Sequence, residues 1–367
     1  MNGYVTPGTS DVPRATACWS CCSSTAARQG TRLISKPWHL VHQMKTLRRM
    51  TKRTFISGRT GAALVAVLVL AGCVGTTRPP APSTVPAVTA AGLEVYVAGD
   101  IADCHGRAPV DSMAARTSRL VPDGALVIGL GDMAYPHGDA QTLASCYEPT
   151  WGQHRATTMA TPGNHDYVGG NANDFLGYFG AGAVHDGGFI AFARALTDDW
   201  RLIALDSNVD GSALQAQYEW LERLLADDAQ ESTRTQGCLL VMWHAPLYSS
   251  GMHRGSGDRM RPFWRLLDSH GADLVLSGHE HFYERFDPLD AQGQAPRAGQ
   301  APRQFVVGTG GARLYGFWKP PYRNKARVLG HGVLQLSLER GRYGWRFIDV
   351  DGRVQDAGVA RCRAAMN

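Results

Sequence analysis

The sequence predicts an α/β domain with a largely buried sheet, and two observations support this fold class. Six apolar runs recur without polar alternation, as expected for strands that are covered on both faces. These runs are 95–99, 125–130, 201–206, 238–243, 273–277 and 304–309. Segments with helical periodicity lie between them. From residue 93 to residue 367 the pattern fits one domain with one core.

The first 72 residues read as an uncertain leader (1–43) followed by an export signal (44–72). A basic stretch, 44–61, contains no Asp or Glu and precedes an apolar run that is too short to span a bilayer. Leu70-Ala71-Gly72-Cys73 resembles the lipobox of bacterial lipoproteins, which implies cleavage before Cys73 and acylation of its thiol. We expect an exported protein, periplasmic or at the cell surface, lipid-anchored to a bacterial membrane through Cys73. An ordinary signal peptide with an incidental cysteine is the alternative.

Residues 73–92 follow as a Pro-rich tether. The segment 74–92 contains four prolines and no acidic residue. Such a composition favours an extended chain, which would hold the domain at 93–367 away from a membrane surface.

The positive charge of the chain belongs to its leader and signal. The whole chain has a net charge of +5, from 37 Lys and Arg against 32 Asp and Glu. Residues 1–72 hold ten of these basic residues and one acid, so the remainder has 27 basic against 31 acidic residues, a net of −4. We therefore expect no nucleic-acid partner, and no protein partner is evident.

Two helices and a terminal hairpin can be placed from the sequence. The first helix is 212–228, where Ser212 and Gln215 form a capping box. The second is 261–270, ended by Gly271. The runs 332–339 and 343–350 predict a closing antiparallel hairpin.

Four cysteines remain after Cys73, and an even number in an exported protein favours two disulfides. They are Cys104, Cys146, Cys238 and Cys362, which allow three pairings. We favour Cys104–Cys146 and Cys238–Cys362, because the first two flank adjacent strand-end loops. No CxxC spacing is left in this part of the chain, which argues against a zinc knuckle.

Polar side chains with metal-binding chemistry follow four of the apolar runs and one short stretch, 158–162. Functional crevices of open α/β sheets lie at the carboxyl ends of the strands. Each residue alone also fits a cap, a turn or a loop. Together these oxygen and imidazole donors, with no thiolate, suit iron, zinc or manganese. They are Asp100, Asp132, Asn164, His244, His279 and His281.

Five sequence blocks resemble those of the calcineurin-like metallophosphoesterases, and the tyrosine in the second block is similar to that of the purple acid phosphatases. The blocks are Gly99-Asp100, Gly131-Asp132-x-x-Tyr135, Gly163-Asn164-His165-Asp166, Val241-x-x-His244 and Gly278-His279-x-His281. The resemblance implies a sandwich of two mixed β-sheets flanked by helices, with a dinuclear metal site at the carboxyl ends of the strands. The sequence departs from the family pattern at two positions: Ala102 stands where Gly is usual, and Asp166 stands where Glu is common. Neither change removes a ligand.

The resemblance also implies which residues hold each metal. The first metal, expected to be Fe(III), would take Asp100, Tyr135 and His281. A second divalent metal (Fe, Zn or Mn) would take Asn164, His244 and His279, and Asp132 would bridge the two. A phenolate is a hard anion that suits Fe(III). Packing of Tyr135 in its loop is the alternative.

The implied activity is hydrolysis of small-molecule phosphate monoesters, as in an acid phosphatase, by in-line attack of a metal-activated hydroxide. His165 is the candidate acid, and His165, Asn164 and His253 are candidates for phosphate contact. Arg254 and Arg285 are further candidates for gripping phosphate. A phosphodiesterase or other metallophosphoesterase of the same fold without Fe(III)-tyrosinate is the nearest alternative. The second alternative is a non-catalytic lipoprotein that binds phosphate or a partner.

Overall fold

The computed structural model describes residues 92–180, 183–230, 237–253, 257–296, 300–320 and 323–363. The predicted leader, the signal peptide, Cys73 and all but the last residue of the tether lie outside these ranges. Among the described residues, no helix combines the length and the apolar character that crossing a bilayer requires.

One of the two large sheets has six strands in the order β16-β15-β14-β1-β3-β5. Strands β1, β3 and β5 are parallel, while β14 and β15 run antiparallel to their neighbours, so the sheet is mixed. The bounds are β1 Leu93–Ala98, β3 Leu126–Gly129, β5 Thr158–Ala160, β14 Gly332–Glu339, β15 Arg342–Asp349 and β16 Val354–Arg361.

The other large sheet has eight strands in the order β13-β11-β12-β10-β9-β8-β7-β6. Its central strands β8, β9, β10 and β12 are parallel, with antiparallel strands on both sides. The bounds are β6 Ala183–Val184, β7 Ile190–Ala195, β8 Trp200–Ala204, β9 Cys238–Met242, β10 Leu274–Ser277, β11 Tyr283–Phe286, β12 Arg303–Val307 and β13 Asn324–Val328.

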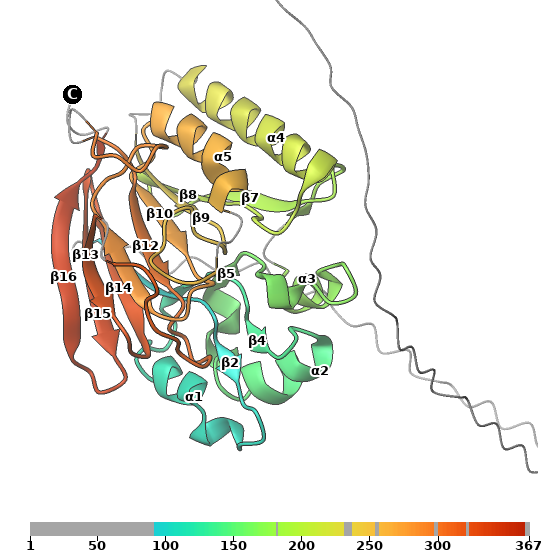
Figure 1. Cartoon of the computed structure of the whole chain (residues 1–367). Coiled ribbons are helices and arrows are strands. Elements are labelled where there is room, and N and C mark those ends of the chain that lie inside the picture. Colours follow the sequence, from blue (N-terminus) through green and yellow to red (C-terminus); the bar gives the residue numbers. More distant parts are fainter. Residues whose placement is uncertain are drawn as a thin grey trace, which may run out of the picture. The chain divides into compact units, whose positions relative to one another are not determined.

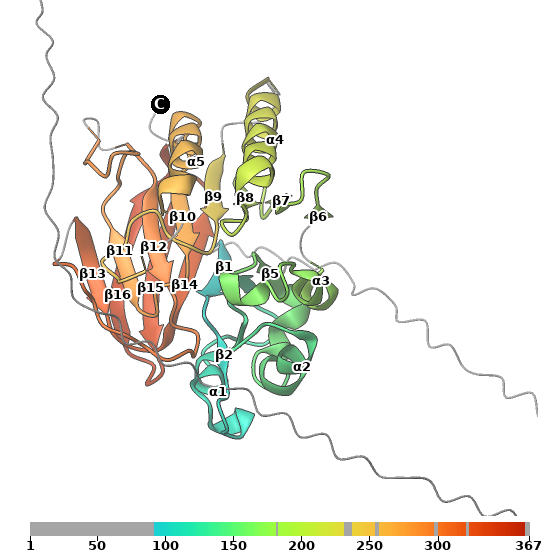
Figure 2. The ribbon, with the colours of Figure 1, turned by 45° about the vertical axis from the view of Figure 1, so that its right-hand side comes forward.

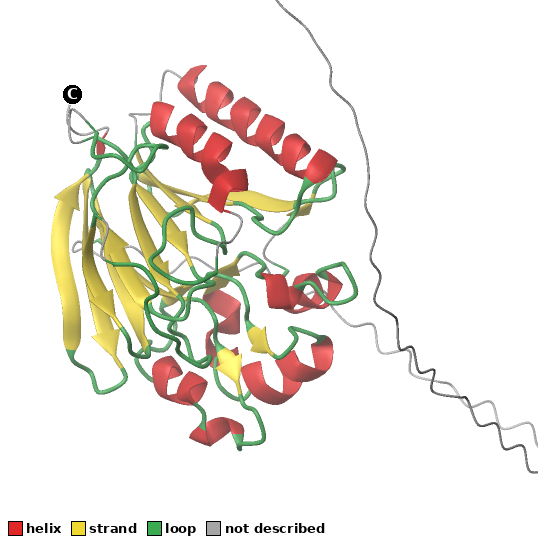
Figure 3. Cartoon of the chain, viewed as in Figure 1, coloured by secondary structure: helices red, strands yellow, loops and turns green. Residues whose placement is uncertain are grey.

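The two sheets pack face to face and helices cover their outer faces, so the predicted sandwich is confirmed. Along β1, Val95 and Val97 face the core between the sheets, whereas Tyr96 and Ala98 face the helical side. Strands covered on both faces need apolar residues at every position, which explains the unbroken apolar runs. Helices α1 (Met113–Ser118), α2 (Ala140–Thr142) and α3 (Asn173–Phe179) lie on one side, and α4 (Gly211–Gln230) and α5 (Gly257–Ser269) on the other (Figures 1, 2 and 3).

Both predicted helices and the hairpin are present, with shifted starts. Helix α4 begins at Gly211, so Ser212 lies in its first turn, and the predicted capping box is wrong; the Gln215 amide donates to Glu219 instead. Helix α5 begins four residues earlier than predicted, and Gly271 after it has a φ of +76°. Strands β14 and β15 form the hairpin.

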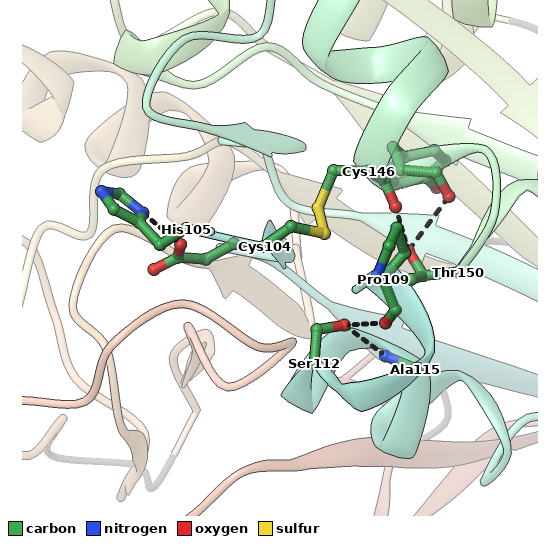
Figure 4. Close-up of a disulfide and its surroundings, with 9 residues drawn as sticks. Cys104, His105, Pro109, Ser112, Ala115, Cys146 and Thr150 are labelled. Carbon is green, nitrogen blue, oxygen red and sulfur yellow. Dashed lines mark hydrogen bonds and ion pairs between the residues drawn. A yellow bond between two sulfur atoms is a disulfide. The ribbon is translucent and has the colours of Figure 1, made fainter. Parts of the chain in front are cut away.

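Both predicted disulfides are present. Cys104–Cys146 joins the loop after β1 to the π-helical turn Leu143–Tyr147, beside the Ser112 side chain that caps α1 (Figure 4). Cys238–Cys362 joins the first residue of β9 to the residue after β16, so it links the two sheets. The Cα atoms lie 5.9 and 5.6 Å apart, as in ordinary disulfides.

Candidate metal centre

The structure brings together all seven residues predicted as metal ligands. Six of them follow the carboxyl ends of parallel strands, three in each sheet, and these ends meet at one edge of the sandwich. Tyr135 comes from β4 (Ala134–Tyr135), which pairs with β2 (Ala102–Asp103) beside that edge. Asp100 follows β1, Asp132 follows β3, Asn164 follows β5, His244 follows β9, and His279 and His281 follow β10.

Glycines before the ligands allow loops from different strands to touch. A Cβ atom at Gly131, where φ is +84°, would lie 2.6 Å from the backbone nitrogen of Gly163 and 2.7 Å from Nδ1 of His244. A Cβ atom at Gly278 would lie 2.6 Å from Oδ2 of Asp100. All three distances are too short for a side chain. Glycine is therefore required for the close packing of the ligand loops.

Three of the predicted ligands have left-handed backbone conformations. The φ angles are 57° at Asp100, 51° at Asp132 and 68° at His279. Residues other than glycine rarely adopt this region, and such strain concentrates at functional sites. The surrounding hydrogen bonds hold it: the backbone N–H of His279 donates to Asp100 Oδ2 at 2.8 Å.

One cluster of donor atoms surrounds the Tyr135 hydroxyl. Its oxygen lies 2.9 Å from Asp100 Oδ1, 3.0 Å from Asp132 Oδ2 and 3.1 Å from His281 Nε2. His281 Nδ1 lies 2.7 Å from the carbonyl oxygen of Arg313, which can only accept. Nδ1 therefore carries the proton of the neutral ring, and the Nε2 lone pair points at the phenol and the carboxylate.

A second cluster surrounds His244 Nε2. This atom lies 3.3 Å from Asp132 Oδ2, 3.1 Å from Asn164 Oδ1 and 3.1 Å from His279 Nδ1. His244 Nδ1 lies 2.7 Å from the carbonyl oxygen of Leu130, so the neutral ring again directs its Nε2 lone pair into the cluster. Asp132 Oδ2 belongs to both clusters.

These donor sets fit a pair of cations. Buried acceptor atoms that face one another are costly unless a proton or a metal ion lies between them. Burial opposes charge on His244, yet the Asp132 carboxylate outweighs burial and raises the pKa of His244 to about 10. Burial and the carboxylates of Asp100 and Asp132 raise the pKa of Tyr135. The chain thus provides a negative, donor-rich site in which only a strongly positive ion would make Tyr135 a phenolate.

His165 lies at the edge of both clusters. Its backbone N–H donates to Asp132 Oδ1 at 2.7 Å, and its Nδ1 lies 2.7 Å from the carbonyl oxygen of Pro136. Its Nε2 is 4.0 Å from Asp132 Oδ2, and the side chain is 37% exposed. The ring is therefore anchored on one side and open to a substrate on the other.

Asp166, the departure in the third block, ties two ligand loops together. Its carboxylate accepts from the backbone N–H of Gly163 at 2.8 Å and from that of Met133 at 3.1 Å. Burial and the charge of Asp132 raise its pKa to about 7. The shorter side chain therefore still supports the outer hydrogen bonds of the site.

His253 also lies beside the site, next to two residues that the sequence analysis missed. Its Nδ1 is 2.9 Å from the hydroxyl of Tyr315 and 3.4 Å from the buried carboxylate of Glu280. Tyr315 donates to the carbonyl oxygen of His279 at 2.6 Å. The segment around Tyr315 carries no motif, whereas Glu280, between two predicted ligands, could have been noticed.

One of the two arginine candidates, Arg285, does not join the site. The Arg285 guanidinium pairs with Asp356 at 2.7 Å, so its predicted contact with phosphate is wrong. Arg254 lies outside the described residues.

Known proteins resemble this chain in sequence and in fold. Purple acid phosphatase 22 of Arabidopsis thaliana is 33% identical over 154 residues, covering 39% of this chain and 34% of that protein. Purple acid phosphatase 21 of the same plant is 27% identical over 245 residues, covering 59% and 52%. The chain thus matches between about a third and about half of the length of these relatives.

Two solved structures share the fold. The purple acid phosphatase PPD1 from yellow lupin (Lupinus luteus) seeds has a TM-score of 0.55 at 18% identity, covering 79% of this chain and 56% of that chain. GAP50, the anchor in the inner membrane complex of Plasmodium, has a TM-score of 0.57 at 14% identity, covering 74% and 89%.

The family model described as calcineurin-like phosphoesterase matches residues 95–283, slightly more than half of the chain. The matched range contains all five sequence blocks. The chain therefore belongs to the calcineurin-like phosphoesterase family, and purple acid phosphatases are among its relatives.

Proposed function

We propose that this protein is a metal-dependent phosphatase that hydrolyses phosphate monoesters at a dinuclear centre. One observation carries the proposal: two clusters of lone-pair donors share Oδ2 of the buried Asp132, as two ions with a bridging carboxylate require. Membership of a phosphoesterase family and similarity to purple acid phosphatases support it.

The ligand sets suit two different ions. Asp100, Tyr135 and His281 would hold Fe(III), because a phenolate and a carboxylate are hard anionic donors. Asn164, His244 and His279 would hold a divalent Fe, Zn or Mn ion. When bound, such a pair supplies Lewis-acid stabilisation of the phosphoryl oxygens and a hydroxide nucleophile at neutral or acidic pH.

The surrounding side chains would bind phosphate and move a proton. His165 Nε2 lies 4.0 Å from Asp132 Oδ2 and would protonate the leaving oxygen. Tyr315 donates its only proton to the carbonyl of His279, so its oxygen accepts from His253 Nδ1. With Nδ1 donating to Tyr315, His253 would contact a phosphoryl oxygen only when Nε2 also carries a proton.

Turnover of two model substrates tests the proposal. Natively purified protein is assayed on p-nitrophenyl phosphate and on bis(p-nitrophenyl) phosphate between pH 4 and pH 8. We expect faster hydrolysis of the monoester and a visible charge-transfer band from tyrosinate on Fe(III). Faster hydrolysis of the diester by a colourless enzyme would favour a phosphodiesterase, and no hydrolysis by metal-loaded protein would refute the activity.

We also propose that the chain is exported and anchored through Cys73. The lipobox-like sequence supports this, and so do the two disulfides, which form in oxidising compartments. Mass spectrometry of the N-terminal peptide should find a lipid-modified Cys73. An unmodified Cys73 within a longer peptide would contradict the proposal.

A further inference from the structure

A cavity of about 550 Å³ opens beside the proposed position of the second metal. Asn164 and His279 form part of its wall, so it is continuous with the metal centre. The rest of the wall comes from the loop after β5, the turn before β7, the segment between β8 and α4, the first turns of α4 and α5, and Ala245 after β9. A substituent on a phosphoryl group bound at the centre can therefore extend into this space.

Two glycines, Gly170 and Gly188, line the cavity without side chains. The φ angles of Gly170 and Gly188 are +85° and +77°, so other residues would be strained there. A Cβ atom built at either position meets no atom within 4 Å. The positive φ angles, and not a lack of space for a Cβ atom, therefore favour glycine at these two positions of the wall.

Most polar groups of the wall already have partners. The Tyr167 hydroxyl donates to the carboxylate of Asp206, and the Asn208 amide donates to the carbonyl of Pro162 at 2.8 Å. Arg259 is the one Lys or Arg among the described wall residues, and Asp210 is the one acid. Specific recognition in the cavity therefore depends chiefly on Arg259.

The Arg259 guanidinium is fixed without being neutralised. Its Nη1 donates to the carbonyl oxygen of Val209 at 3.1 Å, which holds the head group against the wall. Within the described residues no carboxylate lies within ion-pair distance of it. An arginine oriented by a carbonyl presents its remaining N–H groups for a charge-assisted, bidentate contact with an anion.

We infer that Arg259 binds a second anionic group on the substrate, so that the site prefers phosphate monoesters whose leaving group carries a carboxylate or another phosphate. The inference rests on the proposed function, because it places the ester phosphate at the metal centre. Asp210, which follows Val209 in the same wall, repels the same anion and limits the preference.

Binding of phosphonates tests the inference without turnover. Isothermal titration calorimetry on the natively purified, metal-loaded chain compares benzylphosphonate with 4-carboxybenzylphosphonate and p-xylylenediphosphonate. A charge-assisted contact at a partly solvated arginine predicts about tenfold tighter binding of each doubly anionic ligand. The two doubly anionic ligands distinguish a preference for carboxylate from one for phosphate.

Three variants and a control separate the contributions. Arg259→Ala should bring the affinity ratio close to one, Arg259→Lys should keep part of it, and Asp210→Asn should increase it. Arg265→Ala is the matched control, because Arg265 lies on the same helix and is exposed away from the cavity wall. Its ratio should equal that of the wild type.

The outcomes separate the inference from the proposed function. A wild-type ratio near one, or an unchanged ratio in Arg259→Ala, overturns the inference while phosphatase activity can stand. A ratio that depends on Arg259 in a chain that hydrolyses no ester supports the cavity assignment and refutes the activity. If no phosphonate binds, the inference is overturned, and the activity is refuted only when no ester is hydrolysed either.

Discussion

Replacing His165 by alanine separates its proposed acid role from its structural contacts. The backbone N–H that donates to Asp132 Oδ1 at 2.7 Å is kept in His165→Ala. The lost side-chain contacts are the one to the carbonyl of Pro136 at 2.7 Å and a ring contact with Tyr135, whose centroid lies 4.6 Å away. Since the side chain is 37% exposed, no buried cavity is created, and we expect the free energy of unfolding to change by about 0.5 kcal/mol or less.

The size of the kinetic effect should depend on the leaving group. Proton transfer by a positioned side chain contributes about 10²–10⁴-fold, or about 2.7–5.5 kcal/mol. An alkoxide needs that proton, whereas p-nitrophenolate leaves without it. We expect kcat/KM to fall about 10²–10³-fold on glycerol 2-phosphate. On p-nitrophenyl phosphate we expect a loss of about tenfold, the value of one hydrogen bond to phosphate.

The assay is steady-state kinetics on both esters with metal content measured in parallel. His137→Ala is the control, because His137 is an exposed histidine close to the same loop and makes no contact with the donor clusters. Equal losses on the two esters would refute proton donation and leave only an orienting role. Loss of metal in His165→Ala would contradict the claim that this substitution removes the acid without disturbing the metal centre.

Three other perturbations follow from the structure. Tyr135→Phe should abolish the visible absorption band while the protein keeps two metal ions; a retained band would show that another group is the chromophore. The two disulfides close loops of 42 and 124 residues. Cys104→Ser/Cys146→Ser should therefore lower the free energy of urea unfolding by about 4 kcal/mol, and Cys238→Ser/Cys362→Ser should lower it by about 5 kcal/mol. No loss of stability in either double variant would contradict this. Burial raises the pKa of Asp273 to about 6, so the folded chain binds this proton more tightly than the unfolded chain does. That contribution to stability is full below about pH 4 and falls by up to about 3 kcal/mol as the pH rises through 6. In Asp273→Asn the free energy of unfolding, measured by denaturation from pH 4 to pH 7, should therefore fall less steeply with pH. An unchanged pH dependence would contradict this.

The ligand set could be predicted from the sequence because each ligand sits at a strand end. Strands of a buried sheet are readable as apolar runs, and parallel strands carry their ends to a common edge. Once Asp132 and His244 are placed at such ends, their proximity follows. The hydrogen bonds that fix the rings were not readable, because the acceptors are backbone carbonyls of Leu130 and Arg313.

Two residues beside the site could not be placed from the sequence. Tyr315 reaches the site through a segment without a motif, and Arg259 lies in the first turn of α5, before the predicted helix start at 261, so only the folded chain shows their positions. The sequence does not reveal the partner of Arg285, because Asp356 lies 71 residues away. Strand β16 was missed because its residues are mostly exposed and include Gly and Ala, which lack the signal of an apolar run.

The metal content of the purified chain tests the central claim most directly. Elemental analysis of natively purified protein should find two metal ions per chain, with iron as one of them. Asp132→Ala, which removes the carboxylate shared by both donor clusters, should reduce this to less than one. Fewer than one ion in the wild type, or two ions retained in Asp132→Ala, would contradict the claim.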